Sequence, residues 1–297
     1  MRRSLPYTGR FAPSPTGELH LGTLAAAVAS FLHARQADGR WLVRIEDIDP
    51  PREVPGSADR ILRTLEALEL HWDGSVRYQS TRIDEYLAVA DSLLARGLAF
   101  RCRCSRREIR AAEGSVRYPG TCRQLDLPDG DVALRLRVDD AVIRLWDGLR
   151  GGLQRDIALT DGDFVIVRRD GLPAYHLAVV VDDADQGITD IVRGADLLES
   201  TLQHIYLQRC LDVPSPAYWH IPLLTNRAGE KLSKSAGSAA IDPREPAAAA
   251  RRALQLLGLP IPAELAAAPP HELWAYAAGN FSFAGLGKGT ASLPIDD

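Results

Sequence analysis

Apolar residues in the first hundred positions fall into short uninterrupted runs and longer runs with helical spacing. The short runs occupy residues 5–12 and 41–47, and the helical runs occupy residues 24–36, 57–70 and 82–97. A short apolar run is typical of a strand buried in a parallel sheet, whereas helical spacing predicts a helix with one apolar face. Ser57 is a plausible N-cap, and Gly97 is a typical helix stop. Strands that alternate with helices predict an α/β fold built on a parallel sheet.

Between residues 131 and 168 the pattern changes to short alternating stretches, VALRLRV, VIRLWD and FVIVRR. Turn residues at 139–140, 151–152 and 161–162 separate them, which predicts antiparallel strands inserted into the α/β fold. The parallel sheet is expected to resume in residues 172–187, where VVVDD forms a buried run whose two aspartates are structural. Residues 247–259 and 271–282 predict two further helices, joined by a proline-broken linker.

The stretch RFAPSPTGELHLGT, residues 10–23, joins the first predicted strand to the first predicted helix. Pro13 and Pro15 restrict the backbone to an extended turn. Free N–H groups and the dipole at a helix N-terminus favour an anion, so we expect a phosphate here. His20 can donate to that phosphate, and Gly22 leaves room for a nucleotide base. The alternative is an ordinary strand-to-helix turn in which His20 only caps the helix.

A second candidate phosphate contact lies in TNRAGEKLSKSAGS, a stretch rich in glycine and polar residues that is typical of a loop. Lys231 and Lys234 lie three residues apart between small neighbours, so they can neutralise the phosphates of a triphosphate when the loop closes. A solvated surface turn is the alternative for this stretch taken alone. The two candidate phosphate contacts together are more specific than either one.

Charged side chains end three of the predicted strands, at the edge where open α/β sheets bind their ligands. Glu46 ends the second strand, where a carboxylate can hold a substrate amino group; capping of the following turn is the alternative. Arg193 ends a later apolar strand and Arg10 ends the first, so both can bind a carboxylate with paired hydrogen bonds. Tyr175 either lines the same pocket or belongs to the core.

Composition narrows the classes of protein that this chain can represent. At 297 residues and 46% hydrophobic content, it can bury a substantial core and is long enough for two domains. We expect a cytoplasmic protein with no membrane partner, because no apolar run approaches the roughly 20 residues of a membrane span and MRRSLPYTG lacks a signal-peptide core. A net charge of −4 means that any RNA contact is local. The candidate is the run of arginines at positions 101, 103, 106, 107, 110, 117 and 123.

Three of the four cysteines are clustered, as Cys102, Cys104 and Cys122. Such a cluster indicates a metal site in a reducing compartment and not a disulfide framework. Three thiolates suit Zn²⁺, which prefers four tetrahedral ligands, so we expect one structural zinc ion. Water as the fourth ligand and three inert thiols without metal are the alternatives. Cys210, in a helical run, is expected to be a buried core thiol.

HLGT at 20–23 and KLSKS at 231–235 together resemble the two signatures of the class I aminoacyl-tRNA synthetases. Four further stretches are similar to the glutamyl branch of that class: RFAPSPTG (10–17), RIEDIDPPR (44–52), YHLAVVVDD (175–183) and IVRGADLL (191–198). Their order and spacing follow the family over most of the chain. The resemblance implies a Rossmann-type catalytic domain formed by residues 1–100 and 170–240. It also implies an inserted zinc-knuckle domain at 101–169 and a short helical segment at 241–297.

The resemblance also implies which residues form the site. ATP would be bound by His20, Gly22 and Lys234, with Mg²⁺, and charge on its phosphates would be stabilised by His20, Lys231 and Lys234. The positions that match the family's glutamate site are Arg10, Phe11, Ala12, Pro13, Ser14, Glu46, Tyr175 and Arg193, with Glu46 holding the α-amino group. Two arginines would select glutamate over glutamine, since the amide would leave a buried guanidinium unpaired. A CxC…YxxxC knuckle in short relatives implies Tyr118 as the fourth zinc ligand.

After KLSKS, which ends at residue 235 of 297, too little chain remains for the anticodon-binding domain of glutamyl-tRNA synthetases. The chain therefore resembles the glutamyl-queuosine tRNA(Asp) synthetase family, which esterifies the cyclopentene diol of queuosine in the anticodon. An enzyme that modifies the anticodon loop in its active site needs no second domain to read it. The expected partners are ATP, L-glutamate and queuosine-containing tRNA(Asp), and the expected state is a monomer. The alternatives are a truncated glutamyl-tRNA synthetase that charges tRNA(Glu) and a non-catalytic paralogue that binds RNA or an amino acid.

Overall fold

The centre of the fold is a layer of parallel strands. In the computed structural model, which describes residues 6–113, 117–139, 141–225, 241–286 and 291–292, β1 (Thr8–Phe11) pairs with β2 (Arg40–Ile45), and β2 pairs with β3 (Arg77–Tyr78). All four residues of β1 are buried, as the apolar run predicts. The predicted strands at 5–12 and 41–47 are thus confirmed as neighbours in a parallel sheet.

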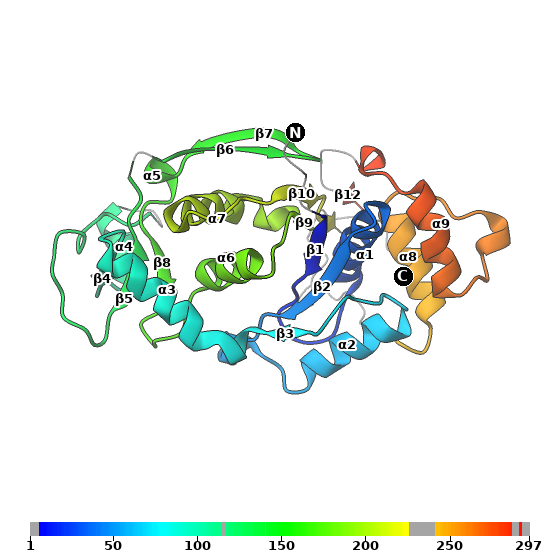
Figure 1. Cartoon of the computed structure of the whole chain (residues 1–297), viewed down its shortest axis with the longest axis horizontal. Coiled ribbons are helices and arrows are strands. Elements are labelled where there is room, and N and C mark those ends of the chain that lie inside the picture. Colours follow the sequence, from blue (N-terminus) through cyan, green and yellow to red (C-terminus); the bar gives the residue numbers. More distant parts are fainter. Residues whose placement is uncertain (1–5, 114–116, 140, 226–240, 287–290, 293–297) are drawn as a thin grey trace.

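A second group of strands extends this layer. β9 (Asp190–Gly194) pairs in parallel with β10 (Ala217–Ile221), and β10 pairs in parallel with β6 (Val142–Asp147). The N–H of Thr189, just before β9, donates to the carbonyl of Thr8 at 2.9 Å, so β9 lies beside β1 (Figure 1). The carboxyl ends of β1, β2 and β9 therefore meet at one edge of the layer.

Helices cover both faces of the layer, and their bounds follow the apolar runs closely. They are α1 (Leu21–Gln36), α2 (Ser57–Ala67), α3 (Ile83–Ala95), α6 (Tyr175–Asp185), α7 (Leu198–Leu211), α8 (Pro246–Leu256) and α9 (Pro270–Asn280). Trp41 and Val43 of β2 pack into the cluster formed with α1, α8 and α9, whereas Leu42 packs into the cluster formed with α3, α6 and α7 (Figure 1). This two-residue alternation buries both faces of the strand. No helix in the described ranges is both long enough and apolar enough to cross a bilayer.

An antiparallel sheet lies at the far end of the molecule from α8 and α9 (Figure 1). β4 (Ala99–Cys102) pairs with β5 (Ala133–Leu136), and β5 pairs with β8 (Phe164–Val167). The remaining elements are α4 (Arg106–Glu113), β7 (Gly151–Asp156), α5 (Ile157–Thr160), β11 (Leu224–Thr225) and β12 (Ala291–Ser292). Short 3₁₀ turns occur at Pro50–Arg52, Gln79–Arg82, Ala195–Leu197, Ala263–Leu265 and Phe283–Gly285.

Three expectations from the sequence need correction. The stretch 172–187 does not resume the sheet: it forms helix α6, whose apolar residues are buried on several sides and therefore look like a buried strand in sequence. Ser57 is not an N-cap, since Gly56 occupies that position with a φ of +71°. VIRLWD does pair antiparallel with β7, but its other neighbour is the parallel strand β10. Gly97 follows α3 with a φ of +71°, as a helix stop requires.

Candidate active site and metal centre

A cavity of about 850 Å³ opens at the edge where β1, β2 and β9 end. Ten residues from the predicted ATP and glutamate sites line it: Arg10, Phe11, Ala12, Pro13, Ser14, His20, Gly22, Glu46, Tyr175 and Arg193. Lys231 and Lys234 lie outside the described residues. The fold thus brings together, around one cavity, side chains that are far apart in the sequence, from residue 10 to residue 193.

The proline turn that follows β1 is held in place by two neighbouring elements. The Ser57 hydroxyl donates to the carbonyl of Gly17 at 2.6 Å and accepts from the N–H of Gly17 at 3.0 Å. The N–H of Glu46 donates to the carbonyl of Pro13 at 3.0 Å. Gly17 has a φ of +131°, a conformation that favours glycine. The first residue of α2 therefore fixes the turn that forms one wall of the cavity.

His20 is the N-cap of α1, and it lies on the wall of the same cavity. Its Nδ1 accepts from the N–H of Thr23 at 3.4 Å, and its Nε2 lies 2.8 Å from the Thr23 hydroxyl. This is the helix-capping geometry that the sequence left open as an alternative. Because the capping ring also faces the cavity, the two interpretations are compatible: an anion bound at this helix N-terminus would meet His20.

Arg193, in β9, carries a buried guanidinium that has only neutral hydrogen-bond partners. It is 5% exposed. Its partners are the Thr201 hydroxyl at 2.7 Å, His220 Nε2 at 3.2 Å, the Tyr175 hydroxyl at 3.3 Å, the Leu197 carbonyl at 3.3 Å and His204 Nδ1 at 3.4 Å. Among the described residues, no carboxylate forms an ion pair with it. A buried charge without a counter-ion is costly, so this arginine favours an anionic ligand in the cavity.

A buried carboxylate–imidazole pair lies behind Arg193. An Asp147 carboxylate oxygen is 2.6 Å from His220 Nδ1. Burial raises the pKa of Asp147, but hydrogen bonds from His220 and from the N–H of Arg150 outweigh it and hold the pKa below its usual value. Burial lowers the pKa of His220. The ionised Asp147 therefore accepts from Nδ1–H, which leaves Nε2 of a neutral ring to accept from Arg193.

Glu46 and Arg10, which also line the cavity, belong to a buried ion cluster. Asp183 Oδ1 lies 3.2 Å from Arg10 Nε and 2.8 Å from Arg44 Nη2, and Arg44 Nη2 lies 3.4 Å from Glu46 Oε1. Burial raises the pKa of Glu46 although Arg44 and Arg10 act against it. Burial also raises the pKa of Asp183, but Arg44 and Arg10 outweigh it and bring that pKa below its usual value. Asp183 is thus a counter-ion that holds two arginines, in agreement with the structural role inferred from sequence.

Tyr175 begins helix α6 and completes the arginine side of the cavity. Its hydroxyl accepts from Arg193 Nη1 at 3.3 Å. Burial raises its pKa to about 12, so the phenol is protonated at neutral pH and retains a proton to donate. Tyr175 therefore lines the pocket, which was one of the two positions that its sequence allowed.

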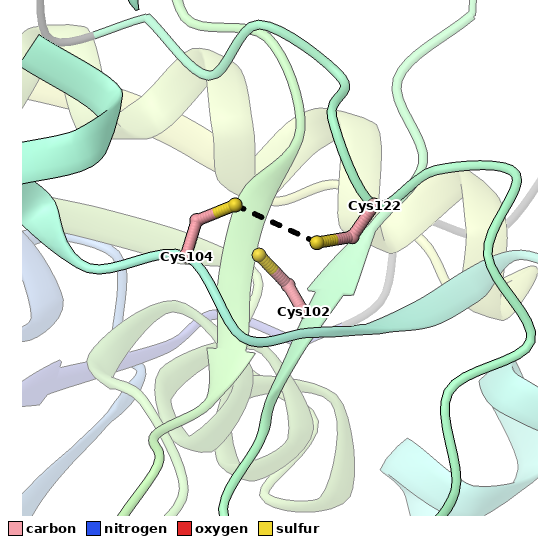
Figure 2. Close-up of side chains that lie close together, drawn as sticks. All are labelled: Cys102, Cys104 and Cys122. Atoms are coloured by element: carbon pink, nitrogen blue, oxygen red, sulfur yellow. Dashed lines mark hydrogen bonds between the residues drawn. The ribbon is translucent and has the colours of Figure 1, made fainter. Parts of the chain in front are cut away.

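The three clustered cysteines point toward one another, and their sulfurs all lie within 4.8 Å (Figure 2). Cys104 Sγ lies 3.5 Å from Cys122 Sγ, and Tyr118 Oη lies 3.4 Å from Cys102 Sγ and 3.9 Å from Cys104 Sγ. Ligands 2.3 Å from a tetrahedral zinc ion lie about 3.8 Å apart, so these spacings fit the edges of such a site. The three sulfurs, together with the neighbouring phenol oxygen of Tyr118, therefore fit the donor set of a zinc ion.

Outside this cluster, Cys210 is half-buried rather than fully buried and packs against the core.

The predicted run of arginines does not form a single exposed basic surface. Arg123 forms ion pairs with Asp139 at 2.7 Å and Asp163 at 3.2 Å, and Arg117 donates to the carbonyl of Ala158. Arg103 and the three arginines of α4 (106, 107 and 110) are exposed.

Sequence reasoning missed the residues that hold Arg193 in place, namely Asp147, His220 and Thr201. Only Asp147 gave a sequence signal, and that signal was weak. This residue ends an alternating strand, and ligands bind at the carboxyl ends of strands in open α/β sheets. His220 lies within the apolar run of β10, and a histidine in such a run is usually interpreted as an ordinary core residue. Only the parallel pairing of β6 with β10 brings Asp147 and His220 together.

With this geometry established, comparison with known proteins identifies relatives. The profile described as "tRNA synthetases class I (E and Q), catalytic domain" matches residues 7–263. A protein from Thiobacillus denitrificans, named glutamyl-Q tRNA(Asp) synthetase, is 55% identical over 279 residues, covering 92% of each chain. One of the same name from Chromobacterium violaceum is 51% identical over 296 residues, covering 97% of this chain and 98% of that protein.

Solved structures agree with these relatives. A glutamate tRNA ligase from Elizabethkingia meningosepticum CCUG26117, crystallised in complex with its amino acid, is 28% identical and superposes with a TM-score of 0.80, covering 97% of this chain and 67% of that one. A second, from Elizabethkingia anophelis, gives a TM-score of 0.81. The α/β fold of class I synthetases, predicted from the sequence, is thereby confirmed.

Proposed function

Because this chain belongs to the glutamyl-Q tRNA(Asp) synthetase family of class I synthetases, we propose that it attaches glutamate to queuosine in tRNA(Asp). L-Glutamate is activated with ATP, and the glutamyl group then passes to the cyclopentene diol at the wobble position of the anticodon. The observation that carries the proposal is the environment of Arg193. A buried guanidinium whose hydrogen bonds all go to neutral groups faces a cavity that contains the predicted nucleotide turn.

Glutamate is held in this cavity by its side-chain carboxylate and by its amino group, each at different residues. Arg193 and Tyr175 bind the side-chain carboxylate, with Arg10 nearby, and Glu46 accepts from the α-amino group. Paired, charge-assisted hydrogen bonds favour the carboxylate over the amide of glutamine. The α-carboxylate is then left free to react.

In the first step, an oxygen of the α-carboxylate attacks the α-phosphorus of ATP. A carbonyl–oxygen–phosphorus bond forms, the bond to the leaving pyrophosphate breaks, and no side-chain nucleophile is needed. The base lies at Gly22, and His20 meets the phosphates at the N-terminus of α1. Lys231 and Lys234, outside the described residues, are proposed to neutralise the phosphates. Class I synthetases use ATP with Mg²⁺, which supplies further charge neutralisation.

In the second step, a hydroxyl of the queuosine diol attacks the carbonyl carbon of the activated glutamate. The new ester bond forms as the anhydride bond to AMP breaks, and the hydroxyl proton leaves with AMP. This scheme requires no thiol or serine hydroxyl as an intermediate carrier, because the activated glutamate reacts with the acceptor directly.

A structural zinc ion would link β4 to the loop after α4, and its ligands would be Cys102, Cys104, Tyr118 and Cys122. All four cysteines of the chain are free thiols in the structure, which fits a reducing compartment such as the cytoplasm. A monomer is the expected state of the chain.

Glutamate-dependent exchange of labelled pyrophosphate into ATP tests the activation step. We expect exchange with glutamate and at least about a hundredfold less with glutamine, because the neutral amide would leave the buried Arg193 guanidinium without an anionic partner. Lys234→Ala is expected to slow exchange, whereas the matched variant Lys288→Ala leaves it unchanged. Absence of exchange in the wild-type chain, with and without tRNA, would favour a non-catalytic paralogue and contradict the proposal.

A further inference from the structure

The cavity that holds the proposed glutamate site adjoins a second cavity. The second measures about 680 Å³ and shares four lining residues with the first: Ser14, Glu46, Arg52 and Tyr175. A third hollow, of about 590 Å³, shares Arg106, Val165 and Arg168 with the second and reaches Cys104 at the cysteine cluster. The three neighbouring hollows, here called the track, therefore lie in a row from the glutamate site to the antiparallel sheet.

The second cavity has the chemistry to receive a nucleoside. Phe164 and His176 lie on its wall in an edge-to-face contact with ring centroids 5.4 Å apart, and the half-buried His176 ring is the one that can pack against a base. The Asp49 carboxylate, held by Arg168 at 3.1 Å and by Arg52, offers an acceptor between two donors. Nδ1 of His176 is buried and has no hydrogen-bond partner among the described residues. The wall therefore combines ring faces with donors and acceptors, as recognition of a base turned out of its strand requires.

The third hollow is lined by arginines and is suited to phosphates. Arg106, Arg168 and Arg169 face it together with Asp131 and Asp170. Arg169 Nε lies 3.4 Å from Asp131, whereas Arg106, exposed on α4, forms no ion pair within the described part of the chain. Guanidinium groups bind phosphate oxygens with paired hydrogen bonds and dominate the salt-dependent part of RNA affinity.

We propose that this track binds the single-stranded RNA on either side of the acceptor nucleoside. The nucleoside, turned out of the anticodon loop, fills the second cavity, so its diol enters the first cavity between Ser14 and Glu46. The flanking phosphates lie on the arginines of the third hollow. The identity of the nucleoside rests on the proposed function, whereas binding of the loop in the track can be measured without any reaction.

The test uses two variants of the full-length chain and a queuosine-containing anticodon stem-loop of tRNA(Asp). Val165→Trp fills the junction of the second and third hollows from strand β8, and Arg106→Ala removes an exposed phosphate contact. Val142→Trp on the exposed face of β6 and Arg63→Ala on α2 are the matched controls. The readouts are the stem-loop Kd as a function of salt and, separately, glutamate-dependent pyrophosphate exchange.

We expect Val165→Trp and Arg106→Ala each to raise the stem-loop Kd by about tenfold, the loss of one phosphate or base contact. Arg106→Ala is also expected to lower the slope of log Kd against log salt by about one, because one phosphate contact is lost. Exchange should stay at the wild-type rate in all four variants, which also shows that they fold. Wild-type Kd values in both test variants would overturn the track. Absence of exchange in the wild type would overturn the proposed function alone, since the Kd values still decide the track.

Discussion

Asp147 and His220 form a fully buried carboxylate–imidazole pair, 2.6 Å apart, directly behind the arginine that faces the active-site cavity. The pair determines which ring nitrogen of His220 carries the proton. Because Asp147 is ionised and accepts from Nδ1–H, Nε2 is an acceptor and holds Arg193 Nε at 3.2 Å. The orientation of the Arg193 guanidinium, which is proposed to bind glutamate, thus depends on a carboxylate that does not itself line the cavity.

Replacement of this carboxylate by its amide tests that dependence. In Asp147→Asn the side chain can donate to Nδ1, so the ring would carry its proton on Nε2 and point a donor at Arg193. We expect the KM for glutamate in pyrophosphate exchange to rise by about tenfold, the effect of one lost hydrogen bond to a charged group. The exposed Asp91→Asn serves as the control. An unchanged KM would show that Asp147 has no part in positioning Arg193.

Even a conservative replacement of Arg193 is expected to weaken glutamate binding. Lysine keeps the charge but loses the planar fork that reaches five neutral partners and is proposed to pair with the glutamate carboxylate. Arg193→Lys should raise the KM for glutamate by at least about a hundredfold. Arg244→Lys, at a position whose side chain is 87% exposed, should behave as wild type. Wild-type kinetics in Arg193→Lys would refute its assignment to the glutamate site.

The cysteine cluster leads to a prediction about metal content and stability. We expect one zinc ion per chain in purified protein, and we expect Cys122→Ser or a strong chelator to remove it and lower Tm. Tyr118→Phe should weaken zinc binding if the phenol oxygen is the fourth ligand. Cys210→Ser, outside the cluster, is the control. Protein that is fully stable with no bound metal would show that the three thiols are inert.

Buried histidines next to Arg193 make stability depend on pH. Burial lowers the pKa of His176 to about 4 and that of His204 well below its usual value, in both cases with help from Arg193. The unfolded chain binds protons on these rings below about pH 6.5, while folded His176 stays neutral down to about pH 4. The free energy of unfolding should therefore fall as pH decreases from about 6.5 to about 4.

Urea denaturation at several pH values measures this loss. His176→Gln should reduce the dependence on pH, because one of the groups that take up a proton on unfolding is removed. His71→Gln, at an exposed position, should leave the dependence unchanged. An identical pH dependence in His176→Gln and the wild type would contradict the role given to His176.

Sequence alone predicted the parts of this site that depend on local patterns. Short apolar runs located β1 and β2, and a rigid proline turn before a helical run located the strand-to-helix turn that carries His20. The positions of Arg10, Glu46 and Arg193 followed from one rule, that parallel strands bring their carboxyl ends to the same edge.

What sequence could not predict depends on the pairing of distant segments. Helix α6 was mistaken for a strand because a helix buried on several sides has no polar face to reveal its period. Ser57 was assigned to its own helix, whereas its hydroxyl bonds to Gly17, forty residues earlier. The link from Asp147 through His220 to Arg193 joins three strands, and it becomes visible only once the order of those strands in the sheet is known.

The most direct test of the central claim is transfer of labelled glutamate, with ATP, to three RNAs. These are queuosine-containing tRNA(Asp), the same tRNA without queuosine, and tRNA(Glu). We expect label on the first RNA alone. Label on tRNA(Glu) would mean that the chain charges the 3′ end of that tRNA, and it would contradict the acceptor proposed here.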